Sequence, residues 1–301
     1  MTATSINQPW NKAHQRIQSS RGAQMRWAIN RALLLVWRPF FRLFMVGVCA
    51  YLIVPTIVVV LASVSDTSYV TFPPQGLTLK WFGNFFSRPG FLQSLALSAS
   101  LATVIAILAV VVSVLLSILF GRKASSFQAM AVSLAYMPLL LPTIVYGPAL
   151  LLWASKLKLV QSFWGTALTL GAAHLVLALP FALQSILVGY ERLDPAYEEA
   201  ALVMGARPGR AFRDVTLPLL MPAIIAGATF SFLISFDEPV VALFFTRIDF
   251  ITLPVQIFQY LRYKPDPTIA AIATVMIVVS MGLVVIADRF IGLGRLMGLR
   301  R

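Results

Sequence analysis

Long uncharged stretches alternate with short charged ones along most of this sequence. A helix needs about 20 residues to cross a hydrocarbon core of about 30 Å, because it rises about 1.5 Å per residue. Six apolar stretches meet that length or come close to it, at residues 43–64, 91–120, 127–155, 165–190, 218–236 and 267–286. The pattern therefore predicts an all-α membrane protein with six transmembrane helices.

The third of these stretches is interrupted by three prolines, Pro138, Pro142 and Pro148. A proline removes a backbone donor and clashes with the preceding turn, so we expect a broken helix here. Inside a membrane, such breaks occur where neighbouring helices or cavity water satisfy the freed carbonyl groups. Pro142 is therefore a candidate for lining a substrate pathway, and a kink that serves packing alone is the alternative.

Both ends of the chain are basic. Residues 1–42 carry seven Lys or Arg and no acid, and residues 289–301 carry four Arg. We interpret these segments as cytoplasmic tails on either side of a transmembrane domain of residues 43–288. The N-terminal tail is too long for the charged region of a signal peptide. Its last part, residues 27–42, is either an interfacial helix or a basic arm that fixes orientation.

Composition agrees with this topology. The chain is 59% hydrophobic and 12% charged, which excludes an ordinary soluble domain. Its net charge of +13 would fit nucleic acid, but 17 of the 24 Lys and Arg fall in the proposed inner segments, which are residues 1–42, 121–123, 191–217 and 289–301. Positive residues concentrate on the cytoplasmic side of membrane proteins. We therefore expect both termini in the cytoplasm, contact with membrane lipid, and no nucleic acid partner.

Ionisable residues are few in the apolar part of the chain. His174 lies inside the fourth stretch, and Asp237 and Glu238 follow the fifth. An ionisable residue within a membrane is a candidate functional residue. His174 either lines the pathway or is a neutral side chain hydrogen-bonded to a neighbouring helix. The two acids would suit a cationic solute; alternatively, they cap the helix end or pair with Arg247.

The longest charged interruption is the loop of residues 191–217. It holds four Arg and five acids, so it must lie in water. Asp194 suits the position before a helix, Pro195 the first helical position, and Gly205 the left-handed residue that ends a helix. A turn and a second short helix should follow, before Pro218 opens the fifth span.

This loop contains Glu199-Ala200-Ala201, then three residues and Gly205, then nine residues and Val215-Thr216-Leu217-Pro218. The string resembles the EAA loop of the membrane subunits of binding-protein-dependent ABC importers, and Val215 in place of Ile is its only departure. The resemblance implies a type I ABC importer permease fold, in which this loop couples the permease to an ATPase. The residues that it assigns to coupling are Glu199, Ala200, Ala201, Gly205, Val215, Leu217 and Pro218.

The same resemblance implies the partners. They are a pair of ATP-binding subunits, a second permease subunit and an extracytoplasmic solute-binding protein, in the inner membrane of a bacterium. The chain has no G-x-x-x-x-G-K-[S/T] string, so we expect no enzymatic activity and no cofactor in this chain, with ATP bound by a partner subunit. Its single Cys and two distant His also provide no set of metal ligands.

Two short strings resemble the spermidine/putrescine branch of this family: Ser235-Phe236-Asp237-Glu238 and Thr252-Leu253-Pro254. The expected solute is therefore a polyamine or a similar small solute, and iron and phosphonates are alternatives. A secondary transporter driven by an ion gradient is the alternative from another class. It would place ionisable residues near mid-membrane, where only His174 stands. A membrane-embedded enzyme has less support, because the spans hold no constellation of His, Ser and carboxylate.

Overall fold

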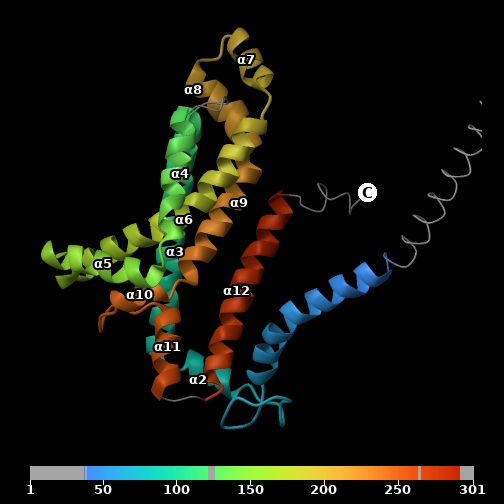
Figure 1. Cartoon of the computed structure of the whole chain (residues 1–301), viewed down its shortest axis with the longest axis vertical. Coiled ribbons are helices and arrows are strands. Elements are labelled where there is room, and N and C mark those ends of the chain that lie inside the picture. Colours follow the sequence, from blue (N-terminus) through green and yellow to red (C-terminus); the bar gives the residue numbers. More distant parts are fainter. Residues whose placement is uncertain (1–36, 38, 121–125, 264–265, 292–301) are drawn as a thin grey trace, which may run out of the picture. The chain divides into compact units, whose positions relative to one another are not determined.

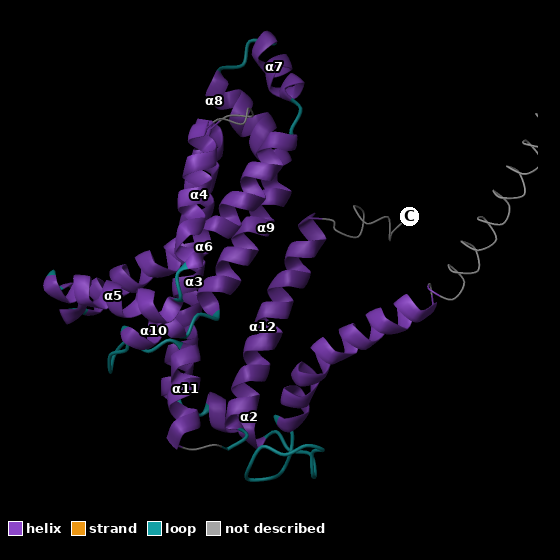
Figure 2. Cartoon of the chain, viewed as in Figure 1, coloured by secondary structure: helices purple, strands orange, loops and turns teal. Residues whose placement is uncertain are grey.

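The protein is described from a computed structural model, which covers residues 37, 39–120, 126–263 and 266–291. These residues form helices joined by loops, and the only β-type pairing among them is an isolated bridge between Arg247 and Phe250. Figure 2 shows this helical composition along the chain. The predicted all-α class is confirmed. The predicted tails, residues 1–42 and 289–301, lie for the most part outside the described residues.

The chain divides into two units, with the boundary after Val58. In the first unit the described residues are helical, and the helix Pro39–Ala62 continues past the boundary. Its 24 residues are long and apolar enough to cross a membrane, as predicted for residues 43–64. The second unit, from Val59 onward, holds all the other described helices.

Four further helices are long and apolar enough to cross a membrane (Figure 1). They are α3 (Pro89–Phe120), α6 (Phe163–Arg192), α12 (Thr268–Ile291) and a helix Pro208–Phe236 whose last part is α9 (Leu217–Phe236). The predicted second and fourth spans, 91–120 and 165–190, are thus confirmed to within two residues at each end.

The predicted third span is a pair of helices, α4 (Ser126–Leu140) and α5 (Thr143–Lys156), bent by 99° at the break between them. Pro142 stands immediately before α5, and a proline disfavours helical geometry in the residue that precedes it. Figure 1 shows α5 crossing the direction of α4. The described chain therefore has five spans, or six if this pair counts as one, where the sequence predicted six.

Shorter helical segments lie in the connections. They are α2 (Lys80–Phe86), a 3-10 turn (Leu159–Gln161), α7 (Pro195–Val203), α8 (Pro208–Ala211), a π-helical turn (Phe212–Thr216), α10 (Val240–Phe244) and α11 (Leu253–Tyr263). The helices α7 and α8 lie together at one end of the second unit, beyond the ends of α6 and α9 (Figure 1). The charged loop therefore projects from the bundle of spans.

The spans α3, α6 and α9 pack against one another. The buried face of α3 carries small side chains about one helical turn apart, at Ser94, Ser98, Ala102, Ala106, Ala109, Ser113 and Ser117. Inside a membrane water does not drive helices together, and small residues let their backbones approach closely instead. Close backbone approach therefore helps to hold these three spans together.

Two glycines mark a close approach of α6 and α9. A Cβ at Gly189 would come within 2.5 Å of the Cβ of Ala223, and a Cβ at Gly227 within 3.2 Å of the Cα of Ala182. Neither neighbour is the end of a flexible side chain. A larger residue at either glycine must therefore push the two helices apart, because packed interiors have no room to absorb a methyl group.

We expect Gly189→Ala to lower the free energy of unfolding of the purified subunit by about 1–3 kcal/mol, because overpacking strains both helices. Gly282→Ala in α12 is the control, because a Cβ there meets nothing within 4 Å. Alanine favours a helix over glycine by about 1 kcal/mol, so the control should be as stable as the parent or more stable. Thermal unfolding in detergent compares the two, and equal midpoints would contradict the close packing at Gly189.

Candidate functional site

The charged loop begins a helix where the sequence predicted it. The Asp194 carboxylate accepts a hydrogen bond from the backbone N–H of Ala196 at 2.9 Å, and Pro195 occupies the first turn of α7. Glu198 lies in the same turn, where the helix dipole favours negative charge. The predicted N-terminal cap is confirmed, so the start of α7 is fixed by its own sequence.

The same helix is closed at Gly205, which has a φ of +90°. The Gly205 N–H donates to the carbonyl of Leu202 at 2.9 Å, and the Ala206 N–H donates to the carbonyl of Ala201 at 3.0 Å. These two bonds form a Schellman motif, in which a left-handed residue closes a helix. Glycine adopts this conformation without steric cost, and the predicted role of Gly205 at the helix end is confirmed.

The chain after this turn is one continuous helix, Pro208–Phe236. We predicted a second short helix and then a span that opens at Pro218. The structure has both, as α8 and as α9, which begins at Leu217, but they are joined without a break. Residues Phe212–Thr216 form a π-helical turn, in which the Leu217 N–H donates to the carbonyl of Phe212. Because Pro218 has no N–H to donate to the preceding turn, a wider turn is tolerated here and the helix continues through it.

Large apolar side chains are exposed towards the end of α7. Val203 is 88% exposed and Met204 82%, and Tyr197 and Leu202 are exposed as well. We call these four residues the α7 patch. A group of exposed apolar side chains marks an interaction surface, whereas a single one does not. Sequence reasoning missed this patch, although two large apolar residues directly before a helix-ending glycine were the available signal.

The predicted coupling residues fall into two groups by exposure. The exposed group is Glu199, Ala200, Gly205 and Pro218, and the buried or half-buried group is Ala201, Val215 and Leu217. Three of the exposed residues lie on or beside α7, close in sequence to the α7 patch. The exposed group is accessible to another protein, whereas the buried group packs within this chain.

A second group of polar side chains is buried between α6 and α9. His174 of α6 is 1% exposed, and its Nδ1 lies 2.9 Å from the Oγ of Ser235 in α9. Its Nε2 has no hydrogen-bond partner among the described residues and lies 3.9 Å from Oε2 of Glu238. The histidine is thus hydrogen-bonded to a neighbouring helix, as one of its two predicted alternatives states, and its other nitrogen faces an acid.

Glu238 caps the helix that follows it, α10. Its carboxylate accepts hydrogen bonds from the backbone N–H groups of Val240, Val241 and Ala242, at 2.9 to 3.3 Å. The first N–H groups of a helix lack partners within it, and a negative charge there also suits the helix dipole. The capping alternative therefore describes Glu238, although the helix that it caps begins after it.

Asp237 has a different environment. It is exposed at the end of α9, and the described residues provide no hydrogen bond or ion pair to its carboxylate. Arg247 donates instead to Asp249 at 2.9 Å and to the carbonyl of Val160 at 2.8 Å, so the alternative in which Arg247 pairs with Asp237 or Glu238 is wrong. The hydrogen bond from Arg247 holds the pKa of the Asp249 carboxyl below its ordinary value. Asp237 is therefore a carboxylate without a partner among the described residues.

The remaining predicted pathway residue, Pro142, stands at the break between α4 and α5 and is not part of the hydrogen-bonded group around His174. Within the described ranges, no group of three His, Cys, Asp or Glu side chains could hold a metal ion.

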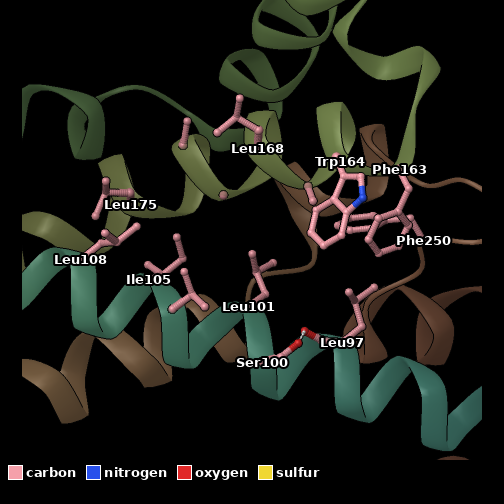
Figure 3. A pocket seen from close by; sticks show the side chains of 14 residues that line it. Leu97, Ser100, Leu101, Ile105, Leu108, Phe163, Trp164, Leu168, Leu175 and Phe250 are labelled. Atoms are coloured by element: carbon pink, nitrogen blue, oxygen red, sulfur yellow. Dashed lines mark hydrogen bonds between the residues drawn. The ribbon is translucent and has the colours of Figure 1, made fainter.

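A pocket of about 560 Å³ lies between α3 and α6 (Figure 3). Apolar side chains of α3, such as Leu101 and Ile105, face Trp164 and Leu168 of α6 across it. Its wall is almost wholly apolar, so a charged solute would lose its hydration there without gaining a partner. A neighbouring pocket of about 640 Å³ is more polar, with side chains that include Gln93, Asp249 and Gln256.

Spans packed through small residues, with a capped helical loop projecting at one end, define a polytopic membrane protein with a water-exposed docking loop. Residues 113–293 match the model of the family described as the binding-protein-dependent transport system inner membrane component. This match covers more than half of the chain, so the chain belongs to that family. It is a multi-pass, non-catalytic subunit of an ABC importer in the bacterial inner membrane, and the predicted family is confirmed.

Two relatives show how the chain compares within this family. It is 30% identical over 245 residues to the spermidine/putrescine transport system permease protein PotC of Haemophilus influenzae, over 81% of this chain and 93% of the relative. It is 29% identical over 247 residues to the molybdenum transport system permease protein ModB of Mycobacterium bovis, over 76% of this chain and 91% of the relative. The predicted resemblance to the polyamine branch is confirmed, but the relatives' names span different solutes.

The fold is similar to that of a chain in the crystal structure of a bacterial ABC transporter involved in the import of the acidic polysaccharide alginate. The TM-score is 0.58 at 15% identity, and the likeness covers 86% of this chain and 96% of that one. At this identity the likeness shows the fold alone, and it confirms the predicted importer permease fold. Family membership sets aside the alternative of a secondary transporter driven by an ion gradient.

We expect Ser235→Ala to lower the free energy of unfolding by about 1–3 kcal/mol, because it leaves Nδ1 of His174 buried without its partner. Ser100→Ala is the control, since the exposed Ser100 hydroxyl donates only to the carbonyl of Leu97 in its own helix. Thermal unfolding in detergent measures both. A Ser235 variant as stable as the Ser100 variant would show that the buried hydrogen bond contributes no net stability.

Proposed function

We propose that this chain is the permease subunit through which an ATP-driven importer moves a polyamine or a similar small solute. A pair of ATP-binding subunits binds and hydrolyses the ATP, which this chain does not bind. A second permease subunit and an extracytoplasmic solute-binding protein complete the importer. The observation that carries this proposal is the α7 patch, an apolar surface on a water-exposed loop with no covering element in the described part of this chain.

The loop residues support docking of the ATP-binding subunits on α7. Val203 and Met204 provide apolar area, and Glu199 beside them provides an exposed carboxylate for a charge-assisted contact. The neighbouring Ala200 is small and exposed, so a partner surface can approach the helix closely. Because Asp194 and Gly205 fix both ends of α7, this surface is already formed before a partner binds.

The proposal places the loop 191–217 and both chain termini on the cytoplasmic side. The distribution of Lys and Arg supports this orientation, with 17 in the proposed inner segments and seven in the outer ones. ATP is available only on the cytoplasmic side, so the loop and the ATP-binding subunits must lie there together. The solute-binding protein then delivers its solute at the opposite face.

Glu199→Ala and Gly205→Asp should each lower ATP-dependent uptake by about tenfold, because loss of a charge-assisted contact or of the left-handed helix end weakens docking. ATP-dependent uptake is measured with the whole importer in proteoliposomes. Retention of the ATP-binding subunits during purification is the second measurement. Gly83→Asp in α2 is the control, because a Cβ there meets nothing within 4 Å and Gly83 lies far from α7 in the sequence.

Both loop variants should remain in the membrane at the parent level. Normal uptake by both variants would refute the coupling role of the loop. Uptake by the parent permease with no ATP-binding subunit present would refute the proposed function itself.

The proposed class of solute rests on two observations. The spermidine/putrescine permease of Haemophilus influenzae is a relative over most of its length, and Asp237 presents an exposed carboxylate without a partner in the described part of the chain. A carboxylate attracts an ammonium group and repels an anion. The proposal therefore favours a cationic solute over an anionic one.

Asp237→Asn should lower the initial rate of spermidine uptake by up to about fivefold at low solute concentration, because an exposed ion pair contributes up to about 1 kcal/mol. Asp237→Glu keeps the charge and should restore most of the rate. Uptake of radiolabelled spermidine by the whole importer, measured over a range of concentrations, separates binding from turnover. Unchanged kinetics in the Asn variant would remove Asp237 from the solute pathway.

A further inference from the structure

The coupling loop is attached to the fifth span by a side-chain hydrogen bond as well as by the backbone. The hydroxyl of Thr216, in the π-helical turn, donates to Oε2 of Glu198 in α7 at 3.2 Å. Thr216 is 2% exposed and Glu198 is half-buried. This bond joins residues 18 positions apart and bridges the turn that Gly205 makes.

The two faces of α7 carry different residues. Glu198 and Ala201 are three positions apart and share one face of the helix, and Ala201 is buried. Glu199 and Val203 are four positions apart and share another face, which is exposed. The inner face therefore rests on this chain and the outer face is open to a partner, so the adjacent glutamates have different surroundings.

The geometry of Thr216 indicates that this contact is specific. A threonine inside a helix ordinarily donates its hydroxyl to the backbone carbonyl three or four residues earlier. Thr229, Thr274 and Thr169 all do so in this chain. Thr216 donates across to another helix instead, from a turn of π geometry, and π turns are found frequently at functional sites.

A link of this kind has a mechanical consequence. Between α7 and α8 the backbone passes through Gly205 in a left-handed turn, and a glycine turn alone bends easily. The hydrogen bond gives α7 a second attachment, directly to the residue that precedes α9. A second attachment provides a direct route for displacement of α7 to reach the start of α9, in addition to the glycine turn and the packing of the inner face.

We propose that Glu198 and Thr216 are positioning residues for transport, and that their hydrogen bond carries displacement of α7 into α9. This inference rests on the proposed function, in which the ATP-binding subunits dock on α7. Glu199 on the outer face contacts the partner. Glu198 on the inner face keeps ATP hydrolysis coupled to movement of the span.

Four single variants test this proposal in the whole importer. Glu198→Ala removes the acceptor and Thr216→Val removes the donor at nearly constant shape, whereas Glu198→Gln and Thr216→Ser keep a hydrogen-bonding group at each position. The measured quantity is solute imported per ATP hydrolysed in proteoliposomes. The first two variants should lower this ratio by about three- to tenfold with the ATP-binding subunits still bound. The two conservative variants should stay close to the parent.

A double variant distinguishes a shared link from two separate defects. If the residues act through one hydrogen bond, Glu198→Ala combined with Thr216→Val lowers the ratio no further than either change alone. An unchanged ratio in the single variants, or a double variant whose effects multiply, would overturn the proposal. Loss of the ATP-binding subunits from the variant complexes would also overturn it, because the pair would then serve docking.

Uptake by the parent importer, measured with and without the ATP-binding subunits, distinguishes failure of this inference from failure of the proposed function. If the parent needs the ATP-binding subunits and the Glu198 and Thr216 variants remain fully coupled, only the proposed link fails. If the parent moves solute without those subunits, the proposed function fails first.

Discussion

The structure depends on one constraint, which is that a backbone N–H or C=O group inside a membrane has no water to bond and must find its partner within the protein. An uninterrupted helix such as α3 meets this constraint by itself. Where the chain turns, a polar side chain provides the hydrogen-bond partner that a helix would otherwise supply. Glu238 accepts the first N–H groups of α10, and the hydroxyl of Ser98 accepts the N–H of Leu253 at 2.8 Å, at the start of α11. The corners after α9 are thus built on polar side chains.

The membrane environment also determines which interactions hold α6 and α9 together. Apolar side chains gain little from meeting one another in lipid, so the two helices are held by close approach at glycine and by hydrogen bonds. The hydroxyl of Ser231 donates to the carbonyl of Ala178 at 3.2 Å, and His174 lies 2.9 Å from the hydroxyl of Ser235. These two polar links lie one turn apart on α9. They constrain the register of the two helices together with the close packing at the glycines.

Local signals predicted much of this structure, and long-range contacts account for what they missed. Apolar length gave α3 and α6 to within two residues, and Asp194 and Gly205 gave both ends of α7. The sequence did not predict that α8 and α9 form the continuous helix Pro208–Phe236, because a proline beside a charged loop is typical of a helix start. The π-helical turn that joins them has no sequence signature. Glu238 was placed at the end of one helix, whereas its partners belong to the next. Breaks were predicted at Pro138, Pro142 and Pro148, but only Pro142 stands at one, the 99° bend. Pro138 and Pro148 lie inside α4 and α5.

A carboxylate lies in the connection at each end of the fifth span, and this arrangement connects the two proposals. Glu198 accepts from Thr216 just before α9, and Glu238 accepts from the backbone of α10 just after it. A helix transmits displacement along its axis, because its backbone hydrogen bonds resist extension and compression. Movement of α7 would therefore reach the corner that presents Asp237, while His174 holds that corner against α6. In the proposed importer, the loop that receives the ATP-binding subunits and the carboxylate that faces the solute lie at opposite ends of one helix.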